Sequence, residues 1–185
     1  MKTIFATILF LALSGMTYAD QGDPPPLPEE SILESTRVVQ PLDSDTSRPS
    51  IAFKINGKGP FRFVLDTGAQ GFVIDADLAR ELTLPVVGQS AMGDPSDPQA
   101  VEVDRVRIES IDLDGVLLKG VIADSWDMPE QMRRHLGGRG IFGLNMLSAF
   151  LVTFDYPSSE IVVENGALPV SSDDRVLPWH AEDDG

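Results

Sequence analysis

Two short runs of β-forming residues flank an Asn-Gly pair, and this arrangement constrains the fold more than any other feature of the sequence. The first run is IAFKI, residues 51–55, and the second is FRFVLD, residues 61–66. Asn-Gly between alternating runs is the strongest short-range signal for a β-hairpin, because both residues tolerate the positive φ angles of a tight turn. We therefore predict two antiparallel strands joined at Asn56-Gly57.

Most of the remaining pattern up to residue 164 is also β-like. Apolar and polar residues alternate with period two, as in Val101, Val103, Val106 and Ile108, which is typical of half-buried strands. The further strands that we expect are residues 72–74, 101–113, 116–123, 151–156 and 160–164. The last two are joined by Pro157-Ser158-Ser159 and form a second hairpin.

The helical segments are predicted to be short. Asp75 is placed to cap a helix over ADLAREL, residues 76–82. Asp127 and Glu130 have the spacing of a capping box that opens a helix ending at Gly137. Residues 88–98, rich in Gly, Pro, Asp and Ser, predict a mobile loop or the tip of a hairpin. The chain is thus expected to be mostly β, with two or three short helices.

Composition excludes several classes of function. The net charge of −15 argues against nucleic acid and anionic membrane as partners, because both require a basic face. The chain has no Cys and two His, which removes disulfides, thiolate metal sites and Cys nucleophiles. We therefore predict no metal and no cofactor.

The first residues are typical of a secretory signal peptide. Lys2 precedes an apolar run over residues 4–13, and Thr17-Tyr18-Ala19 ends in a small residue. The run is too short to span a membrane. We predict cleavage after Ala19 and a periplasmic or secreted mature chain of charge −16, since Lys2 is the only charged residue removed.

These features divide the chain into four parts. The predicted parts are a signal peptide (1–19), a Pro-rich linker or N-terminal extension (20–49), one folded lobe (50–166), and an acidic tail or linker to a further domain (167–185). Within the extension, Val38-Val39 is expected to form an edge strand.

Asp66-Thr67-Gly68 is the segment that points to chemistry. A carboxylate at the end of a strand, followed by Thr-Gly, sits in a tight turn whose amides can point at it. Alone, the tripeptide is also consistent with a turn that caps its own backbone.

The wider context resembles the retropepsin-like aspartic proteases. FVLDTGAQGFVI has an apolar strand, DTGA and a second apolar strand, and GIFGLNML follows some seventy residues later. In that family such segments cross to form the catalytic base of one lobe. The resemblance covers nearly all of residues 50–164 and is strongest to the exported bacterial single-lobe type. It implies a single-lobe, retropepsin-like (acid protease) barrel.

The resemblance also implies roles for individual residues. Asp66 matches the catalytic aspartate, Thr67 the residue whose hydroxyl braces the paired loops, and Gly68 the glycine of the turn. The segment that packs beneath the loop matches Ile141, Phe142 and Gly143, and Ala69 joins these as a binding residue. Leu144 stands where retroviral members have Arg, so an Arg-based interface contact is not expected.

An aspartic endopeptidase needs two carboxylates that share a proton, and this chain has one Asp-Thr-Gly. The resemblance therefore implies a polypeptide substrate and either a homodimer or a second lobe. For a homodimer, we expect Val38-Val39 and residues 161–163 to be edges for interface pairing. The alternative is a non-catalytic retropepsin-like module for peptide binding or assembly.

Overall fold

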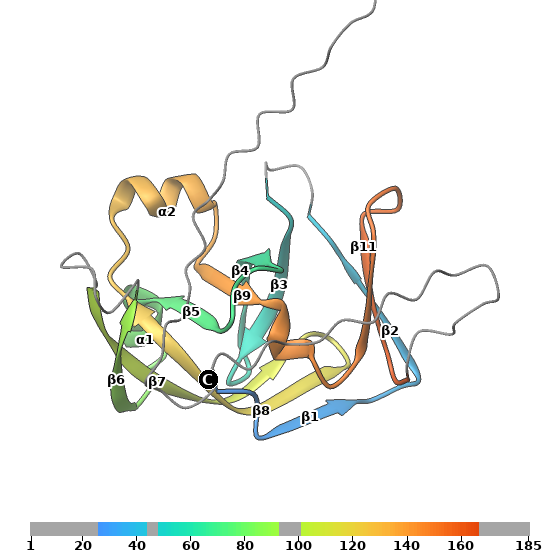
Figure 1. Cartoon of the computed structure of the whole chain (residues 1–185), viewed down its shortest axis with the longest axis horizontal. Helices are drawn as coiled ribbons and strands as arrows, with labels where there is room; N and C mark the ends of the chain where they lie inside the picture. The colour runs from blue at the N-terminus through green and yellow to red at the C-terminus, as the bar shows by residue number, and fades with distance from the viewer. Residues whose placement is uncertain (1–25, 44–47, 93–100, 167–185) are drawn as a thin grey trace, which may run out of the picture.

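The computed structural model describes residues 26–43, 48–92 and 101–166 (Figure 1). The strands are β1 (Glu30–Leu33), β2 (Arg37–Pro41), β3 (Ser50–Ile55), β4 (Lys58–Asp66), β5 (Phe72–Asp75), β6 (Val86–Met92), β7 (Val101–Asp112), β8 (Val116–Trp126), β9 (Gly140–Gly143), β10 (Leu151–Asp155) and β11 (Glu160–Glu164). The helices are α1 (Ala76–Glu81), α2 (Glu130–Leu136) and the 3-10 turn η1 (Leu144–Leu147). The predicted mostly β fold with short helices is confirmed.

Six of the strands close into a barrel. Their order is β8-β5-β9-β4-β3-β7, and β7 pairs with β8 to close the ring. β1 adds to β8 and β6 adds to β7 outside the ring. Two of the contacts are parallel, β4 with β9 and β5 with β8, while the remaining pairs are antiparallel. The β4–β9 pair brings two segments that are distant in sequence together at the end of β4, where Asp66 lies opposite Gly143.

The hairpin predicted at Asn56-Gly57 is present as β3 and β4. Ile55 pairs with Lys58 across a two-residue loop. Asn56 has φ 49° and Gly57 has φ 74°, the two positive angles that a type I′ turn requires.

Four phenylalanines form the centre of the barrel. Phe53 stacks on Phe63 with ring centroids 4.6 Å apart, and Phe72 and Phe142 meet each other edge to face at 5.5 Å. All four side chains are buried. Because they come from β3, β4, β5 and β9, this aromatic cluster joins the strands that surround the Asp66 loop.

A second, three-stranded sheet has the order β10-β11-β2. β11 lies between the other two strands (Figure 1), with Val162 opposite both Thr153 and Val39. The expectation that residues 161–163 form a free edge is therefore wrong, because β2 of the same chain occupies that edge. Val38-Val39 does form the predicted strand.

The expected linker or N-terminal extension over residues 20–49 contributes two strands to the fold, β1 and the predicted β2. β1 pairs with β8, and β2 buries Val38 and Gln40 while Arg37, Val39 and Pro41 remain exposed. β1 was not predicted, because its four residues lack alternation and follow the prolines, so the segment resembles an extended spacer. The boundaries of the other predicted parts stay predictions, and residues 1–25 and 167–185 lie outside the described residues.

Two local predictions differ from the structure. Of the mobile loop or hairpin tip expected over residues 88–98, the loop is wrong for 88–92, which belong to β6. The antiparallel pairing of Met92 with Val101 agrees with a hairpin, and residues 93–100 lie outside the described part. β6 is an edge strand with little burial, so it lacks the alternating pattern. The capping box is also wrong, because α2 begins at Glu130 with Pro129 as its N-cap and without a side-chain cap. Its predicted end at Gly137 is confirmed by a left-handed C-cap.

Among the described residues, no helix has the length and apolar character needed to cross a membrane.

Candidate active site

Asp66 is the last residue of β4, and its side chain is exposed to solvent. The backbone N–H of Gly68 donates a hydrogen bond of 2.8 Å to Asp66 Oδ1. This bond closes the turn immediately after the strand, so the carboxylate is held at the mouth of the loop that runs from residue 66 to residue 71.

Gly143 lies directly beneath that loop. It pairs with Asp66 in the parallel register of β4 and β9, and its N–H donates to the carbonyl oxygen of Gly71 over 2.9 Å. A Cβ at this position would lie 2.5 Å from Gly71 O and 2.6 Å from Ala69 O. Only glycine therefore fits between β9 and the Asp66 loop.

The structure brings the predicted site residues together, but they do not face the same way. Thr67 and Gly68 are exposed beside Asp66, and Ala69 is half-buried. Phe142 is fully buried in the aromatic centre of the barrel. Ile141, its neighbour along β9, belongs to a separate apolar cluster on the opposite face of the sheet. Phe142 can thus support the loop from below but cannot line a cleft.

Sequence reasoning missed this separate cluster. It contains the buried residues Val64, Met128 and Leu136, with Val73, Trp126 and Ile141 packed against them. Met128 and Leu136 come from α2 and the segment before it, which cover the outer face of β4, β5 and β9. The apolar residues at 128 and 136 were visible in the sequence, but no short-range pattern tells which sheet face a helix covers.

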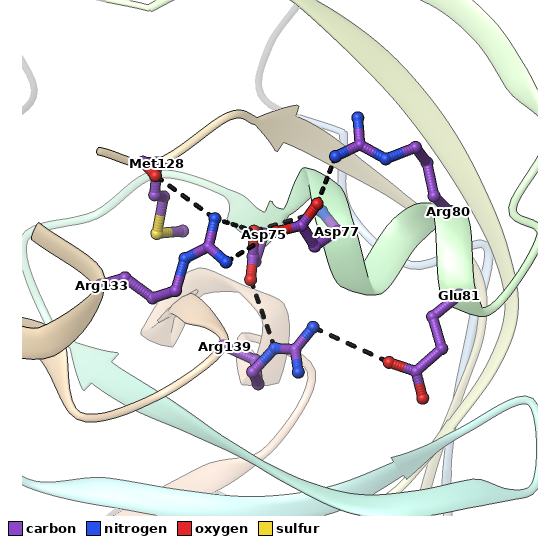
Figure 2. Close-up of polar contacts among 7 residues, drawn as sticks. All are labelled: Asp75, Asp77, Arg80, Glu81, Met128, Arg133 and Arg139. Atoms are coloured by element: carbon purple, nitrogen blue, oxygen red, sulfur yellow. Dashed lines mark hydrogen bonds and ion pairs between the residues drawn. The ribbon is translucent and has the colours of Figure 1, made fainter. Parts of the chain in front are cut away.

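An ion-pair cluster next to these residues was also missed (Figure 2). Its centre is Asp75, whose side chain is fully buried. Asp75 accepts a hydrogen bond of 3.2 Å from the N–H of Asp77, which confirms its predicted role as the cap of α1. Its two carboxylate oxygens also pair with Arg133 at 3.4 Å and with Arg139 at 3.3 Å. A buried carboxylate is stable here because two guanidinium groups compensate its charge.

Arg133 connects α2 to α1. Its Nη1 lies 2.6 Å from Asp77 Oδ2, and Asp77 also pairs with Arg80. The hydrogen bond from Arg133, followed by that from Arg80, lowers the pKa of Asp77 against an opposing desolvation effect. Because the pKa of Asp77 is lower in the folded state, the pair stabilises the fold fully at pH values above the unfolded-state pKa. This contribution is lost as the pH falls through the folded-state pKa. The connection therefore persists in mildly acidic solution.

A groove with a volume of about 730 Å³ lies elsewhere, bordered by α1, β6, β7 and the end of β8. None of the described residues that line it belongs to the Asp66 loop. We place the candidate active site at Asp66 on chemical grounds, because the carboxylate, the turn amide and the glycine beneath them form an ordered arrangement that the groove lacks.

The comparisons with known proteins identify the family. The family model described as "Aspartyl protease" matches residues 51–146, from β3 to η1. The chain belongs to the aspartyl protease family. The match spans both segments of the candidate site, the Asp66 loop and β9.

Solved structures support the fold of this aspartyl protease family member. A crystal structure of a retropepsin-like aspartic protease from Rickettsia conorii superimposes with a TM-score of 0.50. The match covers 74% of this chain and 94% of the other at 12% sequence identity. The predicted retropepsin-like barrel is thus confirmed as a fold. A search of curated proteins gave no significant match.

Metal ions in proteins are held by groups of His, Cys, Asp or Glu side chains. No group of three or more His, Asp or Glu side chains among the described residues is arranged to hold a metal ion.

Proposed function

We propose that this chain is an aspartic endopeptidase that hydrolyses peptide bonds with Asp66 as one of two paired aspartates. The observation that carries the proposal is the exposed Asp66 carboxylate, fixed by the Gly68 N–H above Gly143. The Gly68 hydrogen bond and the close packing of Gly143 beneath the loop hold this carboxylate in place, as a catalytic group requires.

The proposed reaction follows general acid–base chemistry. One aspartate, ionised, accepts a proton from a water molecule that attacks the scissile carbonyl carbon, while the other, protonated, donates to the carbonyl oxygen. The tetrahedral diol then collapses: the first aspartate passes the proton that it took from water to the amide nitrogen, a diol hydroxyl returns a proton to the second aspartate, and the C–N bond breaks. Thr67 would brace the paired loops, and Ala69 and Ile141 would contact the substrate.

The second aspartate must come from outside the described lobe, because the sequence has one Asp-Thr-Gly. The source that we favour is a second copy of this chain around a twofold axis, which would place Asp66 beside its own copy. A further lobe supplied by another sequence is the other source. The proposal locates the mature chain, cleaved after Ala19, in the periplasm or outside the cell.

The single carboxylate also favours a second candidate function. A lobe that never meets a partner aspartate would be a non-catalytic module that binds extended peptides or takes part in assembly. The two candidates differ in one measurement, which is whether peptide bonds break when the purified chain is concentrated.

The pH dependence of cleavage tests the proton shared by the pair. Two carboxylates about 3 Å apart cannot both ionise, so the active form carries one proton between them. We expect a bell-shaped rate of denatured casein cleavage with an acidic optimum, measured at constant ionic strength. A rate that rises steadily to alkaline pH would contradict the aspartic mechanism.

The dependence of rate on protein concentration tests the homodimer. If two copies form the site, specific activity should rise with concentration until the dimer saturates, and added salt should strengthen the dimer by screening the −15 charge of each chain. Sedimentation velocity measured in parallel should show the dimer over the same range. A monomeric chain whose specific activity is independent of concentration would exclude the homodimer.

A mixing experiment provides the control. Adding an excess of the Asp66→Asn chain should lower the cleavage rate of the wild-type chain, because most wild-type copies would then pair with an inactive partner. An inert protein of equal concentration, such as serum albumin, should have no such effect.

A further inference from the structure

The side chain of Asp66 lies on the same face of the barrel wall as an apolar surface. Successive residues of a strand point to opposite faces. Phe63 and Leu65 belong to the central core, whereas Val64 belongs to the separate cluster with Ile141. Asp66 is two residues after Val64 and therefore shares its face. Two residues of a strand span about 7 Å, so this apolar surface begins one side chain away from the carboxylate.

α2 and the segment before it cover this surface. Val64 is 4% exposed, Met128 2% and Leu136 4%. Ile141 and Val73, next to them, are only half-buried. On the apolar face beside Asp66, Val64 is thus covered, whereas Ile141 and Val73 are partly exposed to solvent. The position of α2 determines how much of this face is covered.

Arg133 fixes that position. Figure 2 shows its guanidinium between α2, the start of α1 and Met128. It pairs with Asp77 at 2.6 Å and with the buried Asp75 at 3.4 Å, and it reaches the carbonyl oxygen of Met128 over 3.4 Å. The next residue provides a contrast, because Arg134 forms an ion pair with Glu130 of the same helix.

We propose that α2 is the wall that determines which side chains the Asp66 site accepts, and that Arg133 is the positioning residue that keeps this wall close to Val64. The inference rests on the proposed peptidase function and specifies its substrate. With α2 held in place, the space beside Asp66 is shallow, so the site favours small side chains next to the scissile bond. If α2 is released, the apolar surface becomes open to large ones.

The test compares Arg133→Gln with Arg134→Gln in the full-length chain. Both variants lose one guanidinium from adjacent positions of the same helix, but only the first disconnects α2 from α1. Each protein digests denatured casein, and mass spectrometry counts cleavages next to Phe, Leu or Met against those next to Gly, Ala or Ser. This ratio is measured within one preparation, so a smaller fraction of folded protein does not change it.

We expect Arg133→Gln to raise the ratio of large to small side chains by about tenfold or more, the discrimination that one or two methylenes of pocket space confer. Arg134→Gln should leave it within about twofold of wild type. Arg133→Lys should give an intermediate ratio, since an ammonium can keep the contact with Asp77 but cannot make all three contacts.

The outcomes separate this inference from the function on which it rests. Cleavage that depends on Asp66 but has the same ratio in all three variants would overturn the role of α2 and leave the peptidase intact. An equal change in Arg134→Gln would also overturn it, because α2 would then act through its charge and not through its connection to α1. A chain that cleaves no peptide at any concentration would overturn both proposals.

Discussion

Replacing Asp66 by asparagine is expected to reduce kcat/KM for casein cleavage by about 10³-fold or more. Asparagine has nearly the same volume and can still accept the hydrogen bond from the Gly68 N–H through its amide oxygen. It cannot accept a proton from water, however, and it cannot share a proton with a second carboxylate. Acid–base chemistry and the positioning of water therefore fail together while the turn remains.

Asp155→Asn is the matched control for this substitution. Asp155 also ends a strand, β10, and also accepts a backbone hydrogen bond in a turn, from the N–H of Ser158 over 3.0 Å. Activity of the Asp155 variant should stay within about twofold of wild type, and both variants should unfold at a similar temperature. If the Asp66→Asn protein cleaves casein at the wild-type rate, Asp66 is not catalytic.

Gly143→Ala is expected to have the second largest effect, although the added group is one methyl. Its Cβ would lie 2.5 Å from Gly71 O, 2.6 Å from Ala69 O and 2.8 Å from Asn145 Oδ1. Two of these atoms are backbone carbonyls of the Asp66 loop, which cannot rotate away as a side chain can. The loop or β9 must shift, and a shift of about 1 Å at a reacting group can cost about 10²-fold in rate.

We expect this variant to lose about 10²-fold in kcat/KM and about 1–3 kcal/mol in the free energy of unfolding. Urea denaturation with parallel activity measurements separates the two effects. Gly88→Ala is the control for stability, because a Cβ there meets nothing within 4 Å; its free energy of unfolding should change by about 0.5 kcal/mol or less. If Gly143→Ala changes neither kcat/KM nor the free energy of unfolding, the close packing beneath the loop has no role.

The local parts of this fold could be predicted from the sequence because each has its own short-range signal. The Asn56-Gly57 turn, the Asp75 cap and the Gly137 end of α2 are set by residues within a few positions of one another. The Asp66 loop and its match to β9 were also predictable, but through resemblance to a family, since the register of β4 with β9 joins residues 66 and 143.

The rest depends on contacts that no local pattern encodes. From the sequence, Arg133 is interpreted as a basic residue in the last turn of a helix, where its charge suits the helix dipole. Nothing near it in the sequence indicates that Asp75 or Asp77 is its partner. The pairing of β2 with β11 is missed for the same reason, because almost the whole barrel separates these two strands in the sequence. Exposed edge strands such as β6 lack alternation, so their composition resembles that of a loop.

The pairing of β2 with β11 also bears on how the chain acquires its structure. Val39 lies opposite Val162, so the second sheet closes only when the two extremes of the lobe meet. Contacts between residues this distant carry a large loop-closure entropy and slow the folding of β-rich domains. During synthesis, which begins at the N-terminus, β2 is made before β11. The second sheet therefore cannot be completed until β11 has been added. During that interval β2 is a strand whose edges are unpaired.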